Sequence, residues 1–219
     1  MLLGHFGAAL AAKAIEPSLP LPALMLGTQL IDVVWAGLRL TGVEKVRMQP
    51  KYTATTDFEL TYYPYSHSLP GAVAISAIGA AGAAVLYPQL SGAALVILFA
   101  VVLSHWFLDL LVHVPDLPLL GDRYKVGFGL WNNRPLAMAL EFGIFFAGAA
   151  MYLISLTPAQ TDAATIPLAV VLGGLTLLQF QAFYGPPMKT VQQLALTALL
   201  IYALATAGGY WLDASVAGV

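Results

Sequence analysis

The segment SGAALVILFAVVLSHWFLDLLVH, residues 91–113, carries no ionisable side chain before His105 and then places His105, Asp109 and His113 four residues apart. A transmembrane helix needs about 20 predominantly apolar residues. A transmembrane β-strand would instead alternate apolar and polar side chains over about 10 residues. The segment therefore predicts a membrane-spanning helix that carries ionisable groups in its last two turns.

The composition of the whole chain also indicates a membrane protein. Of its 219 residues, 59% are apolar and only 9% are charged, whereas a soluble domain has roughly 25% charged residues. The net charge is −2 with 9 Lys and Arg residues, too few for the basic surface that binds nucleic acid. The absence of cysteine excludes thiol catalysis and thiolate metal ligands. We therefore expect an integral membrane protein with no nucleic-acid partner.

The uncharged stretches predict an all-α fold, a polytopic transmembrane helical bundle that forms a single domain over residues 1–219. Six or seven membrane segments are expected, because the first stretch is short and fits a short or re-entrant helix better than a full span. The predicted segments are about 2–15, 19–40, 67–87, 91–113, 135–157, 164–184 and 190–211.

Basic residues gather on one side of this predicted bundle. Of the 9 Lys and Arg residues, all but Lys13 lie in or beside the connections near 41–66, 114–134 and 185–190. The positive-inside rule makes this side cytoplasmic. We expect a multi-pass membrane protein with this side in the cytoplasm and membrane lipids as its surroundings.

Seven acids and histidines lie inside the predicted spans, where an ionisable residue costs at least about 2.5–3.5 kcal/mol on insertion scales. At a rise of 1.5 Å per residue, all of them lie within roughly 12 Å of the cytoplasmic boundary. Five different segments thus place acids or imidazoles in one layer, which indicates a polar site that faces the cytoplasm. The residues are His5, Asp32, His67, His105, Asp109, His113 and Glu141.

The spacing of His105, Asp109 and His113 predicts a metal site. Residues four apart lie on one face of a helix, so this face offers imidazole nitrogen and carboxylate oxygen without sulfur. Such ligands suit a divalent metal ion, zinc first, with manganese or iron as alternatives. Since one helix supplies only two or three ligands, the others must come from elsewhere. The further candidates at matching depth are His67, Asp32 and His5.

Each of these residues also has a structural interpretation. The histidines near segment ends could face lipid headgroups: His5, His67 and His113. Two acids could pair with arginines seven residues away: Asp32 with Arg39, and Glu141 with Arg134. His105 and Asp109 could form a buried structural pair.

The stretch before His67 predicts a turn followed by a helix cap, with Pro64 in the turn and Ser66 as the cap. The free N–H groups and dipole of a helix N-terminus favour a bound anion such as phosphate. The connections near 57–68 and 127–135 lie where they could cover the polar layer as a lid.

Four short motifs occur in the order His5, Gln29-Leu-Ile-Asp32, Ser66-His67-Ser68-Leu69 and Ser104-His105-x-x-Leu108-Asp109. Over residues 1–135 the chain resembles the bacterial inner-membrane family of metal-dependent hydrolases that includes a LexA-regulated member. That family usually has a Pro-Asp-x-Asp type motif where this chain has one acid, Asp32, which argues against a second metal ion. Tyr65 and Ser66 also replace the Arg and Thr that commonly precede the His-Ser pair.

We therefore predict a membrane-embedded metal-dependent hydrolase that acts at the cytoplasmic leaflet on a small amphipathic ester or phosphoester, such as a lipid. A bound metal would activate water at neutral pH, with Glu141 and Asp32 as candidate catalytic groups. A phosphoester is preferred because of the predicted helix N-terminus at His67. The alternative is a transporter that uses the same cluster as a proton or metal-ion relay. The candidate metal ligands are His5, Asp32, His67, His105, Asp109 and His113.

Overall fold

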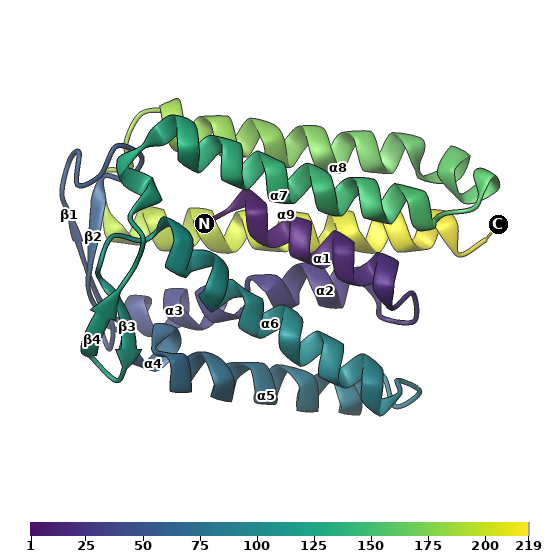
Figure 1. The fold of residues 1–219 in the computed structure, drawn as a ribbon, viewed down its shortest axis with the longest axis horizontal. Coiled ribbons are helices and arrows are strands. Elements are labelled where there is room, and N and C mark those ends of the chain that lie inside the picture. The colour runs from purple at the N-terminus through teal and green to yellow at the C-terminus, as the bar shows by residue number, and fades with distance from the viewer. Residues whose placement is uncertain (219) are drawn as a thin grey trace.

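A computed structural model of the chain describes residues 1–218. Within this range there are 9 α-helices and two short β-hairpins, which confirms the predicted all-α helical bundle (Figure 1). The helices run roughly along one long axis. They are α1 (Leu3–Ile15), α2 (Leu21–Thr28), α3 (Leu30–Leu40), α4 (Pro64–His67), α5 (Leu69–Leu86), α6 (Gly92–Val112), α7 (Arg134–Ser155), α8 (Pro158–Tyr184) and α9 (Val191–Val216).

Five helices, α5 to α9, are long and apolar enough to cross a membrane. A sixth span results if the bent pair of α2 and α3 is counted as one. The first predicted segment forms α1, which has only 13 residues and is about 20 Å long at 1.5 Å per residue. The chain is thus a membrane protein in which α1 is shorter than the roughly 30 Å hydrocarbon core.

The segment predicted as one helix over residues 19–40 is broken at Gln29, where α2 and α3 meet at a bend of 52°. The carbonyl oxygen of Thr28 lies 2.7 Å from Nδ1 of His105 on α6, so it bonds outside its own helix. Gln29 is fully buried and donates from Nε2 to the carbonyl of Leu2. These tertiary bonds stabilise the break, and they place Asp32 in the first turn of α3.

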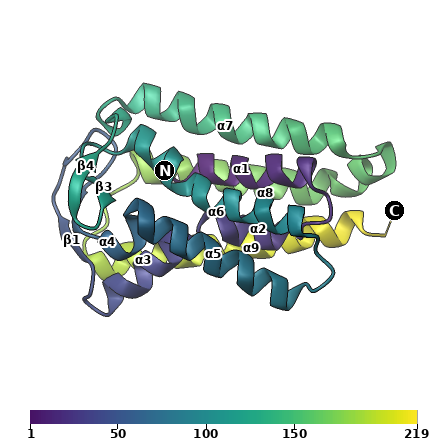
Figure 2. The same ribbon diagram turned by 60° about the horizontal axis from the view of Figure 1, so that its bottom comes forward.

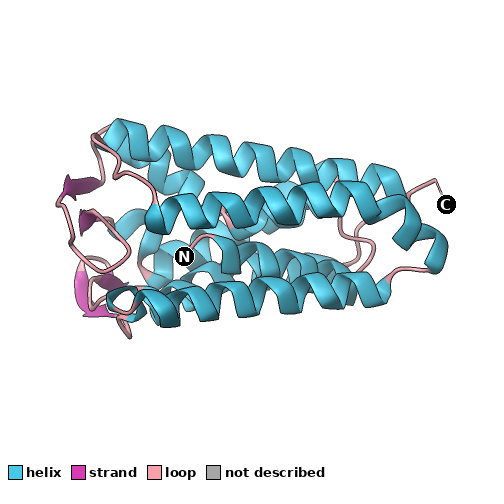
Figure 3. Ribbon diagram, turned by 90° about the horizontal axis from the view of Figure 1, so that it is seen from above, coloured by secondary structure: helices cyan, strands magenta, loops and turns pink. Residues whose placement is uncertain are grey.

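Two antiparallel hairpins occupy connections that the sequence analysis treated as loops. β1 (Lys45–Met48) pairs with β2 (Phe58–Tyr62), and β3 (Leu117–Leu120) pairs with β4 (Arg123–Val126). Both hairpins lie at one end of the bundle, and the C-terminus lies at the other (Figure 3). We call the first of these the hairpin end.

The packing of α1 against α7 depends on two glycines. A Cβ atom at Gly148 would collide with the carbonyl oxygen of Gly7, and one at Gly7 would collide with the carbonyl of Ile144. The two backbones therefore approach as closely as small residues allow. Figure 2 shows α1 beside α7 inside the bundle, and this contact fixes the height of His5.

The far end of α1 is held by an ion pair. Nζ of Lys13 lies 3.0 Å from Oδ1 of Asp213 on α9, and it also donates to the carbonyl of Leu19 at 2.8 Å. The main hydrophobic cluster lies between this end and the ionisable residues. On α6, for example, its members are Ala94, Leu98 and Val101, all in the half of the helix before His105.

Candidate metal centre

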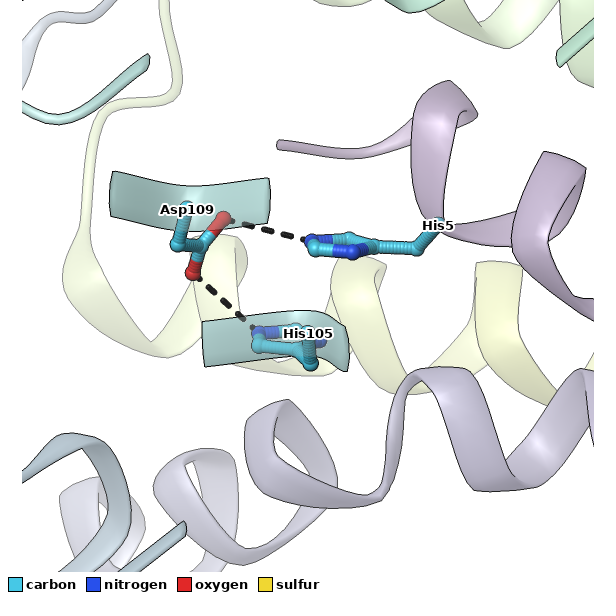
Figure 4. Close-up of side chains that lie close together, drawn as sticks. All are labelled: His5, His105 and Asp109. Atoms are coloured by element: carbon cyan, nitrogen blue, oxygen red, sulfur yellow. Dashed lines mark hydrogen bonds and ion pairs between the residues drawn. The ribbon is translucent and has the colours of Figure 1, made fainter. Parts of the chain in front are cut away.

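The structure brings the six predicted ligand residues together from α1, α3, α4 and α6, near the hairpin end. Asp109 is at the centre of the group: its Oδ2 lies 3.2 Å from Nε2 of His105 and 3.5 Å from Nε2 of His113. Its Oδ1 lies 3.2 Å from Nε2 of His5 on the neighbouring helix (Figure 4). All four side chains are buried.

Asp32 supplies the second carboxylate. Its Oδ1 lies 3.3 Å from Nε2 of His67 and 3.7 Å from Nε2 of His105. Its Oδ2 accepts a hydrogen bond from the Tyr202 hydroxyl at 2.6 Å. The side chain of Asp32 is 19% exposed and that of Asp109 only 3%, so Asp32 is the more accessible of the two carboxylates.

The spacing predicts that His113 lies within the last turn of α6, but in the structure it lies one residue after the end of this helix. The helix ends at Val112, and His113 follows it with an extended ψ of 141°. Its Nδ1 lies 2.9 Å from Oδ1 of Asp116, so the carboxylate accepts the Nδ1 proton and leaves Nε2 directed at Asp109. Carboxylates commonly orient metal-binding histidines in this way.

Asp116 is itself held by Tyr63, whose hydroxyl donates to Oδ1 at 3.3 Å. Burial, together with the negative charge of Asp116, raises the pKa of the Tyr63 phenol well above its ordinary value. Tyr63 therefore stays protonated and remains a donor across the physiological pH range.

The tautomer of His105 follows from its contact with Thr28. A carbonyl oxygen can only accept, so Nδ1 of His105 donates to Thr28, and in the neutral ring Nε2 carries the lone pair. This Nε2 is buried and has no hydrogen-bond partner. The ring stacks on that of His5 with centroids 3.9 Å apart, which fixes the direction of Nε2.

The tautomer of His67 is set by hydrogen bonds that begin at Glu44. The Ser66 hydroxyl donates to Oε2 of Glu44 at 2.6 Å, and Oγ of Ser66 lies 2.7 Å from Nδ1 of His67. Because the single hydroxyl proton goes to Glu44, Nδ1 of His67 must be the donor to Ser66. Nε2 of His67 therefore presents its lone pair to Asp32.

In their neutral forms these three imidazoles direct Nε2 lone pairs at two carboxylates, so a cation is needed among them, either a proton on Nε2 or a metal ion. The backbone nitrogen of Met1 lies 2.6 Å from Oδ1 of Asp109. Two sets of residues that share His105 could each hold a metal ion. Within each set, the candidate ligand atoms all lie within 4.8 Å of one another. The two sets are His5, His105 and Asp109, and Asp32, His67 and His105.

Glu141, the predicted acid–base residue, contacts the first turn of α1 instead of joining either set. Its Oε2 accepts backbone N–H groups from Leu2 at 2.9 Å, Leu3 at 2.7 Å and Gly4 at 3.4 Å. The carboxylate thus satisfies the free N–H groups at the start of the helix. A catalytic role for Glu141 stays a prediction.

Of the structural interpretations, only the buried pair of His105 and Asp109 describes a contact that forms, with Nε2 3.2 Å from Oδ2. Within residues 1–218, Asp32 makes no ion pair with Arg39, and Glu141 makes none with Arg134. The guanidinium of Arg134 donates to the carbonyl of Ala54 instead. The three histidines that could have faced headgroups are all buried: His5 (0% exposed), His67 (2%) and His113 (2%).

The predicted anion site at the turn before His67 was wrong. Ser68 rather than Ser66 caps α5, by accepting the N–H of the third residue after it. The backbone N–H groups of Tyr65 and Ser66 both donate to Oε1 of Glu44 at 2.9 Å. A carboxylate of the chain itself therefore occupies the position expected for phosphate.

Three residues that hold the ligands were not predicted: Glu44, Asp116 and Tyr202. Asp116 could have been found, because it lies three residues after His113 and between two prolines. Glu44 and Tyr202 lie far along the chain from the side chains they contact, and no local spacing marks them.

A cavity of about 950 Å³ lies beside the candidate ligands. Asp32, His67, Asp109 and His113 are among its polar lining residues. The two connections predicted as a lid form part of its wall, and Oγ1 of Thr55 joins them by donating to the carbonyl of Trp131 at 3.3 Å. The rest of the wall is largely apolar and includes Trp35, Leu60, Leu178, Phe183, Leu194 and Ile201.

No protein-family model matches the sequence, and no curated protein and no solved structure matches the chain. The function is therefore inferred from the residues and geometry of the site.

Proposed function

We propose that this protein is a membrane-embedded, metal-dependent hydrolase that binds one divalent ion, zinc in the first instance. The observation that carries the proposal is the direction of the imidazole lone pairs. Nδ1 of His67, His105 and His113 donates outward to Ser66 Oγ, the Thr28 carbonyl and Asp116, respectively. Each Nε2 is thereby left free to bind a cation beside Asp32 or Asp109. Nitrogen and carboxylate ligands without sulfur favour zinc, with manganese or iron as alternatives.

A divalent ion in this position would supply a Lewis acid and lower the pKa of water at the site. Of the chain's own groups, Asp32 is best placed to accept a proton, because it is the more accessible carboxylate and lines the cavity. Tyr202 keeps Asp32 oriented through its hydroxyl. The apolar neighbours of the site exclude bulk water, which strengthens electrostatic interactions there.

The cavity favours an amphipathic ester or phosphoester as the substrate, because candidate ligands and apolar side chains line the same cavity. The resemblance to inner-membrane hydrolases supports the same class of reaction. The resemblance favours a bacterial inner membrane, and the distribution of basic residues favours an orientation with the hairpin end in the cytoplasm. The site would then meet lipids of the cytoplasmic leaflet.

Transport through the bundle is less well supported. A relay needs polar groups that continue toward the opposite end. Beyond His105, the buried positions of α6 are occupied by Val102, Val101, Leu98 and Ala94. The ion pair of Lys13 with Asp213 lies on the far side of this apolar layer.

The proposal is tested by elemental analysis of the purified protein together with an activity assay. Wild type should retain a transition metal after dialysis and should hydrolyse dodecyl p-nitrophenyl phosphate or p-nitrophenyl dodecanoate. The variant His105→Ala, Asp109→Ala should lose both properties. Arg123→Gln, at an exposed position that does not line the cavity, is the matched control and should retain both. The site would be rejected if wild type is active without bound metal, or if the double variant keeps full metal occupancy.

A further inference from the structure

Two cationic side chains that the proposed metal site does not use also line the cavity: Lys51 and Arg134. Lys51 is exposed and Arg134 is half-buried, so both lie toward the open side. Within residues 1–218 neither side chain forms an ion pair with a carboxylate. Cations without a carboxylate partner in the wall of a cavity indicate a ligand that carries negative charge.

The guanidinium of Arg134 is held in place yet retains unused donors. Its Nη2 donates to the carbonyl of Ala54 in the loop between β1 and β2. The group lies over the ring of Tyr184, 5.0 Å from the centroid. Its Nε is buried and has no hydrogen-bond partner. A planar donor group of this kind matches the oxygens of a phosphate or carboxylate.

Lys51 is positioned by its backbone. It adopts a positive φ of 57°, and its N–H donates to Oδ1 of Asp57 at 2.7 Å. Asp57 also lines the cavity, but the contact that it makes is with the backbone of Lys51 rather than with the ammonium group. The ammonium group therefore remains available.

A third unused donor lies deeper in the cavity wall. Gln179 on α8 is 1% exposed, and its Oε1 accepts the backbone N–H of Leu3 at 3.2 Å. Its Nε2 has no partner. A buried amide donor without a partner is costly, so a ligand oxygen that accepts from Nε2 would be stabilising.

We propose that the cavity binds a single-chain amphiphile with an anionic headgroup, as the substrate of the metal site proposed above. The headgroup is bound by Arg134 and Lys51, and one of its oxygens accepts from Gln179. The alkyl chain lies against Trp35 on α3 and Leu194 on α9. Three of the acids that line the cavity already accept hydrogen bonds within the chain: Glu141 and Asp57 from backbone N–H groups, and Asp32 from the Tyr202 hydroxyl.

The probe is dodecyl phosphate with a bromine atom at the end of its chain, because bromine quenches a tryptophan that it contacts. The protein is kept in a neutral detergent. The difference in quenching between wild type and Trp35→Phe measures binding of the probe in the cavity. EDTA is added so that no metal can attract the phosphate. Inorganic phosphate is tested as a competitor, which separates a lipid-like ligand from the free anion. The equivalent brominated phosphocholine and alcohol test the need for net negative charge.

The phosphate amphiphile should bind at least ten-fold more tightly than its phosphocholine or alcohol counterpart. Arg134→Gln should weaken binding about ten-fold, as expected for the loss of a charge-assisted hydrogen bond, and Arg134→Lys should restore part of it. Arg123→Gln is the matched control, because Arg123 is exposed and does not line the cavity. Gln179→Glu keeps the acceptor for Leu3 but replaces the donor by a negative charge, so it should also weaken binding.

Equal binding of the charged and neutral probes, or no effect of both Arg134→Gln and Gln179→Glu, would overturn the proposal. Competition by inorganic phosphate that matches the amphiphile would instead identify a free-anion site and would equally reject it. The test is separable from that of the hydrolase. His105→Ala, Asp109→Ala should still bind the probe in EDTA although it has lost metal and activity.

Discussion

Replacement of Tyr202 by phenylalanine tests whether the ligand geometry depends on groups outside the metal-binding sets. The Tyr202 hydroxyl donates to Oδ2 of Asp32 at 2.6 Å, and the tyrosine is 5% exposed. Removal of the hydroxyl leaves one carboxylate oxygen of Asp32 without its donor. Oδ1, which faces His67 and His105, then loses its fixed orientation.

Two magnitudes follow from this geometry. A short hydrogen bond from a hydroxyl to a carboxylate is charge-assisted, and hydrogen bonds to charged groups contribute about 1.5–3 kcal/mol. Tyr202→Phe should therefore lower the free energy of unfolding by that amount. Loss of a residue that orients a metal ligand typically reduces metal affinity about 10–100-fold, and we expect a decrease in this range.

Affinity is measured by competition of the purified protein with a zinc chelator, and stability by thermal unfolding in the same detergent. Tyr152→Phe is the matched control, because the Tyr152 hydroxyl is equally buried but has no hydrogen-bond partner. That variant should leave zinc affinity unchanged, and it should not lower stability, because the hydroxyl that it removes is buried without a partner. If Tyr202→Phe binds zinc as tightly as Tyr152→Phe does, the assignment of Asp32 as a ligand held by Tyr202 is wrong.

Three further outcomes are expected. Gly148→Val should destabilise the protein by about 1–3 kcal/mol or more, since its side chain would meet the carbonyl of Gly7; Gly143→Ala, with no atom near its Cβ position, should be tolerated, and thermal unfolding measures both. Ser66→Ala should lower zinc affinity about 10–100-fold by freeing Nδ1 of His67; unchanged affinity in the chelator competition would contradict the assigned tautomer. Zinc at about 100 times its Kd should raise the free energy of unfolding of wild type by about 2.7 kcal/mol, and a melting temperature that is insensitive to zinc and EDTA would argue against a native metal site.

The spans and the depth of the ionisable residues could be predicted because both follow from position along the chain. Uncharged runs of helical length identify α5 to α9, and a residue's distance from the end of its run gives its depth. The break at Gln29 could not be predicted in this way. It depends on the Thr28 carbonyl bonding to His105, a contact between residues 77 positions apart.

Within the site, the residues that gather could be predicted, but several of their partners could not. His105 and Asp109 were identifiable because charge is rare in these helices. The role of Glu141 depends on the backbone of Leu2 and Leu3, at the other end of the chain. Glu44 is buried, but the sequence does not distinguish it from the exposed charged residues of the same polar connection. Its capture of two N–H groups is a purely tertiary feature.

The two attachments of α1 have a consequence for the surrounding bilayer. This helix is too short to cross the hydrocarbon core, and it is fixed by Glu141 at its start and by the Lys13–Asp213 pair at its end. Spanning helices adjust to bilayers of different thickness by tilting, whereas the height of α1 is set by protein contacts alone. The position of His5 should therefore be the same in thin and thick membranes. Lipid composition would then change how a substrate enters the cavity, but not the geometry that it meets there.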